Sequence, residues 1–163
     1  EDAVYLNEAN AKLASLREQL LESRMIEHVR RINAKAPARE IVTAVLAAAK
    51  STRLDPVLLL AKIETESHYR PTAVSSSGAR GLAQIVRGTA KELGLPWERA
   101  FDVNLSVMAG ATYLRRQLDA VGGDLHMALG RYNGWDDEQY QAKIMRVQAR
   151  LRGGRDYVGN YYR

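Results

Sequence analysis

Apolar residues recur at helical spacing through nearly the whole chain, and the spacing is most regular at its start. Residues 3 to 33 contain neither Gly nor Pro. Within this stretch the apolar side chains recur at steps of three and four, at Leu6, Ala9, Leu13, Leu16 and Leu20. Such heptad spacing predicts a long amphipathic helix. We expect this helix to pack along its own domain, and a coiled-coil seam is the alternative.

After residue 20 the apolar stripe of this helix moves to a different side. Its members are then Met25, Ile26, Val29 and Ile32. The helix is broken at residues 33–37, a small-residue segment that ends in Pro. Because this is the clearest break in the chain, we predict a helical arm at residues 1–37 and a main domain at residues 38–163.

The pattern of the main domain predicts an all-α fold. No run shows the strict alternation of a half-buried strand, whereas helical spacing continues beyond Pro37. Asp55 and Pro56 are residue types of an N-cap and a first helical turn, and the helix that they open should end near His68. Further helices are expected at about residues 89–93, 104 or 105 to 121, 125–132, 137–151 and 156–162.

Length and composition exclude several classes of protein. With 163 residues the chain has room for one domain and an appended element. It contains no Cys, which excludes disulfides, thiolate nucleophiles and Cys-based metal sites. The histidines are His28, His68 and His126, and they lack the spacing of a metal site. The longest apolar stretches fall far short of the roughly 20 residues that cross a bilayer.

The charge of the chain favours an acidic partner. The formal net charge is +5 and the isoelectric point is near 9.6. This excess would favour nucleic acid, an anionic membrane surface or a carboxylate-rich cell wall, and it does not choose among them. The sequence lacks the aromatic-basic platform or recognition helix of a nucleic-acid binder. The chain begins at Glu1 without a leader, so export is neither shown nor excluded.

Glu66 is the candidate for catalysis by a carboxyl group. It falls in the last turn of a predicted helix, on the face of Ile63 and opposite to Glu64. Apolar neighbours and the negative end of the helix dipole both favour a protonated carboxyl, which a general acid at a glycosidic oxygen requires. The alternative is a surface ion pair with Lys62, four residues earlier, that has no catalytic meaning.

A second carboxylate is hard to find near Glu66. Glycosidases of the common kind place one at roughly 5–9.5 Å from the acid, yet residues 67–91 contain neither Asp nor Glu. The remaining candidates are better explained as helix caps or turn residues, and they are Asp102, Asp124, Asp136 and Asp137. The shortage suits a mechanism in which one carboxyl group acts together with the substrate's own groups.

The most specific pattern begins at Glu66. It consists of Glu66-Ser67, then Ala73-Val-Ser75-Ser-Ser-Gly-Ala-Arg-Gly-Leu-Ala-Gln84, then Thr89-Ala90, Asn104-Leu105 and Tyr132-Asn133. In this order and at these distances the pattern resembles the catalytic domain of the soluble lytic transglycosylase family, relatives of goose-type lysozyme. The resemblance covers roughly residues 41–158.

This resemblance implies a lysozyme-like multi-helix domain. It also implies cleavage of the β-1,4 bond between N-acetylmuramic acid and N-acetylglucosamine in peptidoglycan, without water, to a 1,6-anhydromuramic end. Glu66 matches the family's single catalytic acid and base. The residues that match positions lining the substrate site are Ser75, Gln84, Tyr132, Asn133 and Tyr157. No metal or organic cofactor is implied, and the setting would be the periplasm or cell envelope, or a virion for a phage protein.

Two other functions fit the same residues. One is a true hydrolase of peptidoglycan or chitin with the same fold. The other is a catalytically silent wall-binding or assembly protein whose helical arm is its working part. The chain also departs from the family pattern at Ala83, at Val86-Arg87 and at Gly134-Trp135, which concerns the shape of the substrate site. The small size and the arm favour attachment to a secretion, conjugation or phage apparatus.

Overall fold

The computed structural model describes residues 2–133 and 138–153, with the backbone alone for residues 132 and 133. The helices of this part are α1 (Asp2–Ile32), α2 (Ala38–Thr52), α3 (Pro56–Ser67), α4 (Arg87–Glu92), α5 (Val103–Ala120), α6 (Leu125–Asn133) and α7 (Glu138–Leu151), with a 3-10 turn η1 (Trp97–Arg99). Within the same residues, β contacts are limited to isolated bridges from Arg80 to Val74 and to Ile85. The predicted all-α fold is therefore confirmed.

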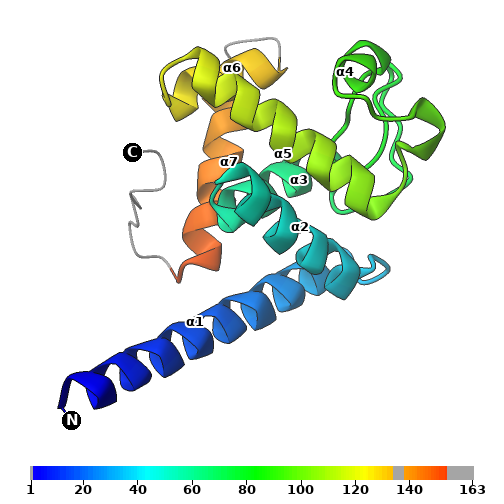
Figure 1. Ribbon diagram of the computed structural model, residues 1–163. Coiled ribbons are helices and arrows are strands. Elements are labelled where there is room, and N and C mark those ends of the chain that lie inside the picture. The colour runs from blue at the N-terminus through cyan, green and yellow to red at the C-terminus, as the bar shows by residue number, and fades with distance from the viewer. Residues whose placement is uncertain (1, 134–137, 154–163) are drawn as a thin grey trace.

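The helices α2 and α3 lie at the centre of the molecule, where α2 packs on α5 and α3 packs on α7 (Figure 1). The first seven residues after Pro56, 57 to 63, are all buried. Asp55 caps α3 as predicted, because its side chain accepts the N–H of Val57 at 3.0 Å. Asp55 also pairs with Arg152, at the end of α7. The start of α3 is thus fixed from two sides.

A smaller hydrophobic cluster lies beside the main core, around α4 and η1. Its buried members are Ala83, Ile85, Ala90, Leu95, Ala100 and Ala109. Gly81 lies where this smaller cluster meets α5, and its φ angle is +77°. A Cβ at this position would lie 2.2 Å from the carbonyl oxygen of Ala100 and 2.7 Å from Oγ of Ser106. The loop after α3 thus lies so close to α5 that only Gly fits at this position.

The long helix α1 packs on the rest of the molecule only through its last third. Met25 and Val29 are fully buried in the main core. Residues 2–20 are exposed, and α1 projects from the domain in Figure 1. The expectation that the helix packs along its own domain is therefore wrong for residues 2–20. The reason is the shift of the stripe, which turns the two apolar sets toward different sides of the helix.

The predicted bounds of α4, α5, α6 and α7 agree with the structure to within two residues. The turn η1 was not predicted, and the helix expected at 156–162 lies outside the described residues. The division of the chain at residue 37 stays a prediction. Among the described helices, none has the length and hydropathy to cross a membrane.

Candidate active site

Glu66 lies in the last turn of α3, where the buried helix reaches the surface. Its side chain is 14% exposed, so it is mostly buried but still accessible to solvent. The next residue, Ser67, is buried and donates its hydroxyl to the carbonyl of Ile63 at 3.1 Å. His68 and Tyr69 then adopt left-handed φ angles of 49° and 58°, which end the helix at once. The sequence prediction of Glu66 at a helix C-terminus is confirmed.

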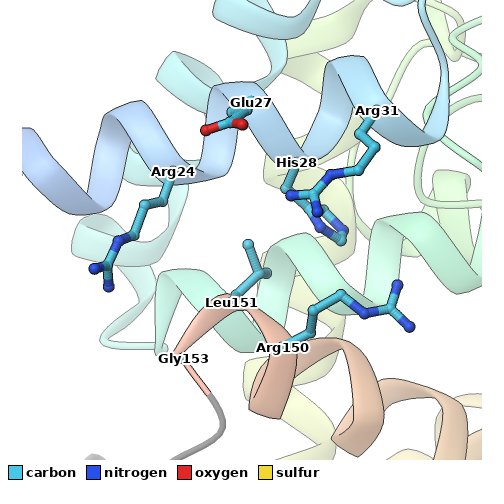
Figure 2. A pocket seen from close by; sticks show the side chains of 7 residues that line it. All are labelled: Arg24, Glu27, His28, Arg31, Arg150, Leu151 and Gly153. Atoms are coloured by element: carbon cyan, nitrogen blue, oxygen red, sulfur yellow. The ribbon is translucent and has the colours of Figure 1, made fainter.

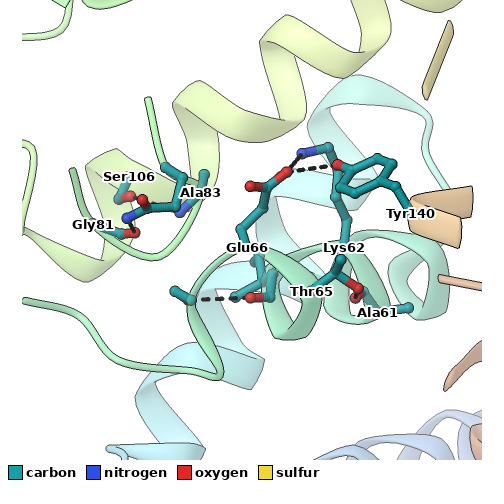
Figure 3. A network of polar contacts seen from close by, with 11 residues as sticks. Ala61, Lys62, Thr65, Glu66, Gly81, Ala83, Ser106 and Tyr140 are labelled. Atoms are coloured by element: carbon teal, nitrogen blue, oxygen red, sulfur yellow. Dashed lines mark hydrogen bonds and ion pairs between the residues drawn. The ribbon is translucent and has the colours of Figure 1, made fainter. Parts of the chain in front are cut away.

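Two donors from different helices meet one oxygen of Glu66. Nζ of Lys62, on α3, donates to Oε1 at 3.0 Å, and the hydroxyl of Tyr140, on α7, donates to the same atom at 2.6 Å. In Figure 3 the carboxyl extends from α3 to the ends of both side chains. Both donors are buried, with Lys62 1% and Tyr140 7% exposed. The carboxyl is therefore held by a rigid pair of partners.

The ion pair between Lys62 and Glu66 exists, but it is not the surface pair considered from the sequence. Burial lowers the pKa of Lys62 from its usual 10.5 to about 8, and the charge and hydrogen bond of Glu66 act in the opposite direction. A lysine with this environment keeps its positive charge near neutral pH while its proton is loosely held. The candidate acid Glu66 therefore has a buried positive charge, that of Lys62, as its partner.

Tyr140 was missed by the sequence analysis. A signal for it was present, because Tyr140, Ile144, Val147 and Leu151 form the buried stripe of α7 at steps of four and three. A tyrosine on such a stripe needs a partner for its hydroxyl, and α3 is the helix that α7 packs against. Only the packing of the two helices, which the sequence does not give, identifies that partner as Glu66.

Glu64 points to the opposite side of α3 from Glu66, as its position on the helix predicts. Its side chain is 13% exposed, so it is as buried as that of Glu66. Its Oε2 lies 2.5 Å from Nε2 of His28, on α1, and accepts the hydroxyl of Tyr69 at 3.2 Å. Burial raises the pKa of Glu64, but the hydrogen bond and charge of His28 outweigh this and the pKa is lowered. Burial and Glu64 raise the pKa of Tyr69. This cluster joins α1 to the end of α3 and is separate from the polar partners of Glu66.

A cavity of about 280 Å³ lies on the Glu64 side of the molecule, between α1 and the end of α7. Arg24, Arg31 and Arg150 line it together with His28 (Figure 2). A neighbouring cavity of about 200 Å³ is lined by Glu64 and shares Arg150. Neither lining includes Glu66. These basic cavities therefore do not belong to the candidate active site.

The loop between α3 and α4 carries two of the predicted substrate residues. Ser75 Oγ accepts the N–H of Ala79 at 3.0 Å and contacts Oγ of Ser77 at 2.9 Å. Gln84 has a left-handed φ of 50°, and its Nε2 donates to the carbonyls of Ala73 at 3.2 Å and Gly81 at 2.9 Å. Both side chains hold the loop in shape. Their contact with a substrate stays a prediction.

The same loop is tied to α5. Oγ of Ser106 accepts the N–H of Ala83 at 3.2 Å, and Ser106 is buried. Figure 3 shows Gly81, Ala83 and Ser106 gathered at this junction. The junction uses the backbone N–H of Ala83, one of the positions at which the chain departs from the family pattern. The backbone of this turn is thereby fixed.

The side chains of three predicted substrate residues lie outside the described part of the structure. Tyr132 and Asn133 end α6, and their side chains lie outside the described part of the structure. Tyr157 lies outside the described residues altogether, as does Trp135. Their roles stay predictions.

The other carboxylates near helix starts act as caps, as predicted. Asp102 accepts the N–H of Leu105 at 2.9 Å, a bond that lowers the pKa of Asp102, and Asp124 accepts the N–H of Met127 at 3.0 Å. Asp136 and Asp137 lie outside the described residues. Among the residues that the structure describes, no group of His, Asp and Glu could hold a metal ion.

Known proteins resemble the chain over the segment that carries Glu66. The sequence pattern that defines the "Transglycosylase SLT domain" matches residues 43–145. The chain belongs to this SLT domain family. The matched segment contains α3, the loop after it, α4, α5 and α6, and it ends inside α7 after Tyr140.

Several relatives of this SLT domain carry transglycosylase names. The "Transglycosylase" of Enterobacteria phage PRD1 is 35% identical over 108 residues, which is 61% of this chain and 40% of that protein. The "Membrane-bound lytic murein transglycosylase F" of Maricaulis maris is 37% identical over 116 residues, which is 68% of this chain and 24% of that protein. The chain thus spans less than half the length of these relatives.

A solved structure shares the fold of this SLT domain. It is the X-ray structure of an inactive mutant of lytic transglycosylase Slt from Pseudomonas aeruginosa, with a TM-score of 0.60 and 17% sequence identity. The similarity covers 74% of this chain and 26% of that one. At this identity the likeness establishes the helical architecture.

Proposed function

We propose that the chain is a peptidoglycan lytic transglycosylase in which Glu66 is the single catalytic acid and base. The observation that carries the proposal is the 14% exposed carboxyl at the end of α3, with one oxygen held by Lys62 and Tyr140. Membership of the SLT domain family and relatives named as murein transglycosylases support it. The substrate would be the β-1,4 bond between N-acetylmuramic acid and N-acetylglucosamine.

The geometry suggests which oxygen of Glu66 carries the proton. Oε1 accepts two hydrogen bonds, and the ammonium of Lys62 has no acceptor to offer in return. The proton of the acid form therefore belongs on Oε2, which would meet the glycosidic oxygen. When that proton is transferred, the new carboxylate is stabilised at Oε1 by a charged and a neutral donor.

The reaction would then proceed in two proton transfers without water. Glu66 protonates the leaving oxygen while the bond from that oxygen to C1 of the muramic acid breaks. The carboxylate next accepts the proton of the C6 hydroxyl as O6 bonds to C1 and closes the 1,6-anhydro ring. One bond to C1 is broken and one is formed, and Glu66 returns to its acid form.

Five further residues are proposed to line the substrate site: Ser75, Gln84, Tyr132, Asn133 and Tyr157. Ser75 and Gln84 would act from the loop between α3 and α4, whose shape they also maintain. Tyr132 and Asn133 end the helix that directly precedes the α7 segment carrying Tyr140.

The setting we propose is the periplasm or cell envelope, or a virion for a phage protein. We further propose that residues 1–37 form an arm and residues 38–163 the catalytic domain, and that the arm attaches the enzyme to a secretion, conjugation or phage apparatus. The exposed first part of α1 and the similarity to a phage transglycosylase support this.

Digestion of purified peptidoglycan sacculi, followed by mass spectrometry of the fragments, tests the reaction type. Fragments ending in 1,6-anhydromuramic acid are the expected product. Fragments with reducing ends would instead establish a muramidase of the same fold. The absence of turbidity clearing, with the chain bound to the sacculi, would establish a silent wall-binding protein.

A further inference from the structure

The exposed part of α1 carries a line of leucines, Leu6, Leu13, Leu16 and Leu20, which we name the leucine seam. Their exposed fractions run from 45% at Leu13 to 63% at Leu6. Leu6, Leu13 and Leu20 are each seven residues apart, and Leu16 follows Leu13 by three, so the seam has the spacing of a two-helix contact. An apolar line of this length on a free helix is a candidate interaction surface.

The seam does not face the domain that carries it. At about 100° of turn per residue, Met25 and Val29 lie roughly 120–160° around the helix from Leu13. Those two residues are buried in the core, and the His28–Glu64 contact at 2.5 Å fixes the same part of α1 to α3. The helix is therefore anchored at one end while its leucine seam points elsewhere.

The charges around the seam are sorted by sign. The charged residues that flank the leucines between residues 3 and 24 are basic: Lys12, Arg17 and Arg24. The acidic residues of the same stretch, Glu8, Glu18 and Glu22, lie about 120–160° away from the middle of the seam. An occupant of the seam would thus meet leucines bordered by positive charge.

This sorting disfavours a second copy of the chain as the occupant. In a parallel pair of identical helices Lys12 of one copy would lie beside Arg17 of the other, and in an antiparallel pair Arg17 would face its own equivalent. Like charges at these positions are destabilising. A lipid surface is also disfavoured, because the side of α1 that would face water is acidic and the apolar side has no Trp or Phe.

We propose that the leucine seam of α1 is the docking site for an amphipathic helix of another protein whose apolar stripe is bordered by Asp and Glu, an inference that rests on the attachment role proposed above for the arm. The contact would be a short heterodimeric coiled coil over residues 6–20, in which leucines supply the affinity and the opposite charges supply the choice of partner. The anchored end of α1 would hold that partner at a fixed place relative to the domain.

Binding of two designed peptides to the full chain tests this. Both have four heptads with Leu at the a and d positions. One has Glu at every e and g position and the other has Lys. Fluorescence anisotropy of labelled peptide should show binding of the Glu peptide at least tenfold tighter than of the Lys peptide, with loss of binding in the Leu13→Glu variant.

Reversing the basic charges beside the leucine seam is the decisive experiment. The double variant Lys12→Glu with Arg17→Glu should invert the preference to the Lys peptide. Glu18→Lys, on the far side of α1, is the matched control and should leave the preference unchanged. Circular dichroism checks that the fold is kept, which we expect because residues 2–20 contribute nothing to the core.

Three results would overturn the proposal. The first is equal or absent binding of both peptides. The second is a dimer of the chain in sedimentation that dissociates on Leu13→Glu, which would assign the seam to a second copy. The third is binding to vesicles of phosphatidylglycerol and phosphatidylcholine that is lost in the same variant, which would assign it to a lipid surface.

Discussion

The ammonium of Lys62 lies 3.0 Å from Oε1 of Glu66, at a position where only 2% of the Lys62 side chain is exposed. A charged lysine so deep in a domain is costly unless it is paired, and its carboxylate partner here is the candidate catalytic residue. The structure thus keeps a buried charge beside the group whose protonation the reaction depends on.

Replacement of Lys62 should lower both activity and stability. In Lys62→Met the side chain keeps a similar apolar stem, while Oε1 of Glu66 loses its charged donor. We expect the rate of anhydromuropeptide release to fall about tenfold or more, a loss of about 1.4 kcal/mol in the transition state. The melting temperature should also fall, because the mostly buried carboxylate of Glu66 is left without its charged partner. Lys143→Met, at an exposed position of α7, is the control and should change neither quantity.

The lowered pKa of Lys62 predicts how stability depends on pH. Below pH 8 the lysine is charged in both states, and the native state bears the cost of burying that charge. Between pH 8 and about 10.5 the unfolded chain binds this proton and the native chain does not, so the contribution of Lys62 to stability rises with pH. Thermal unfolding should show that the melting temperature of the wild type rises relative to that of Lys62→Met between pH 8 and pH 10. A wild-type melting temperature that falls relative to that of Lys62→Met over this range would contradict the assigned direction.

Tyr140→Phe removes the hydroxyl that Glu66 accepts at 2.6 Å and leaves the buried ring in place. We expect a stability loss of about 1 kcal/mol, the usual net value of one hydrogen bond. Activity should fall by more than this loss explains, because the carboxyl loses its link to α7. Urea unfolding and initial rates on sacculi measure the two effects. Tyr5→Phe, on the exposed part of α1, is the control that should leave both unchanged.

Two glycines in the loop after α3 allow a matched test of packing. Gly81 and Gly78 have similar φ angles of +77° and +80°, but only the Cβ at position 81 would collide, with Ala100 and Ser106. The backbone strain of an Ala substitution is therefore similar at both positions, but the added Cβ collides with neighbouring atoms only at position 81. We expect Gly81→Ala to lower the free energy of unfolding by about 2 kcal/mol more than Gly78→Ala. Equal losses would mean that the loop can move away from α5.

The sequence predicted the parts of this molecule that depend on local signals. Asp55 and Pro56 mark the start of α3, and Pro71 marks where it must have ended, because caps and prolines act within one or two turns. The motif from Glu66 to Gln84 is also a local pattern of residues, and it identified the family. Helical geometry alone predicts that Glu66 and Glu64 point in opposite directions. The motif that begins at Glu66 is what chose between them.

The remaining features depend on how the helices meet. Lys62 sits inside a run of apolar residues, and its position next to Glu66 could be predicted while its burial could not. The side of α1 that would contact the domain was predicted from the more regular leucine stripe, yet the later stripe at Met25 and Val29 is the one that packs. Gln84 matched a substrate-binding position, whereas its hydrogen bonds to Ala73 and Gly81 follow from its left-handed φ.

The most direct test of the account is the release of anhydromuropeptides from sacculi by Glu66→Gln beside the wild type. Gln keeps the shape of the side chain and can still accept the hydrogen bonds at Oε1, but it has no proton to give to a glycosidic oxygen. We predict that the variant melts at the wild-type temperature within a few degrees and releases no 1,6-anhydro ends, while the wild type does. Continued release by a folded Glu66→Gln chain would contradict the assignment of Glu66 as the acid.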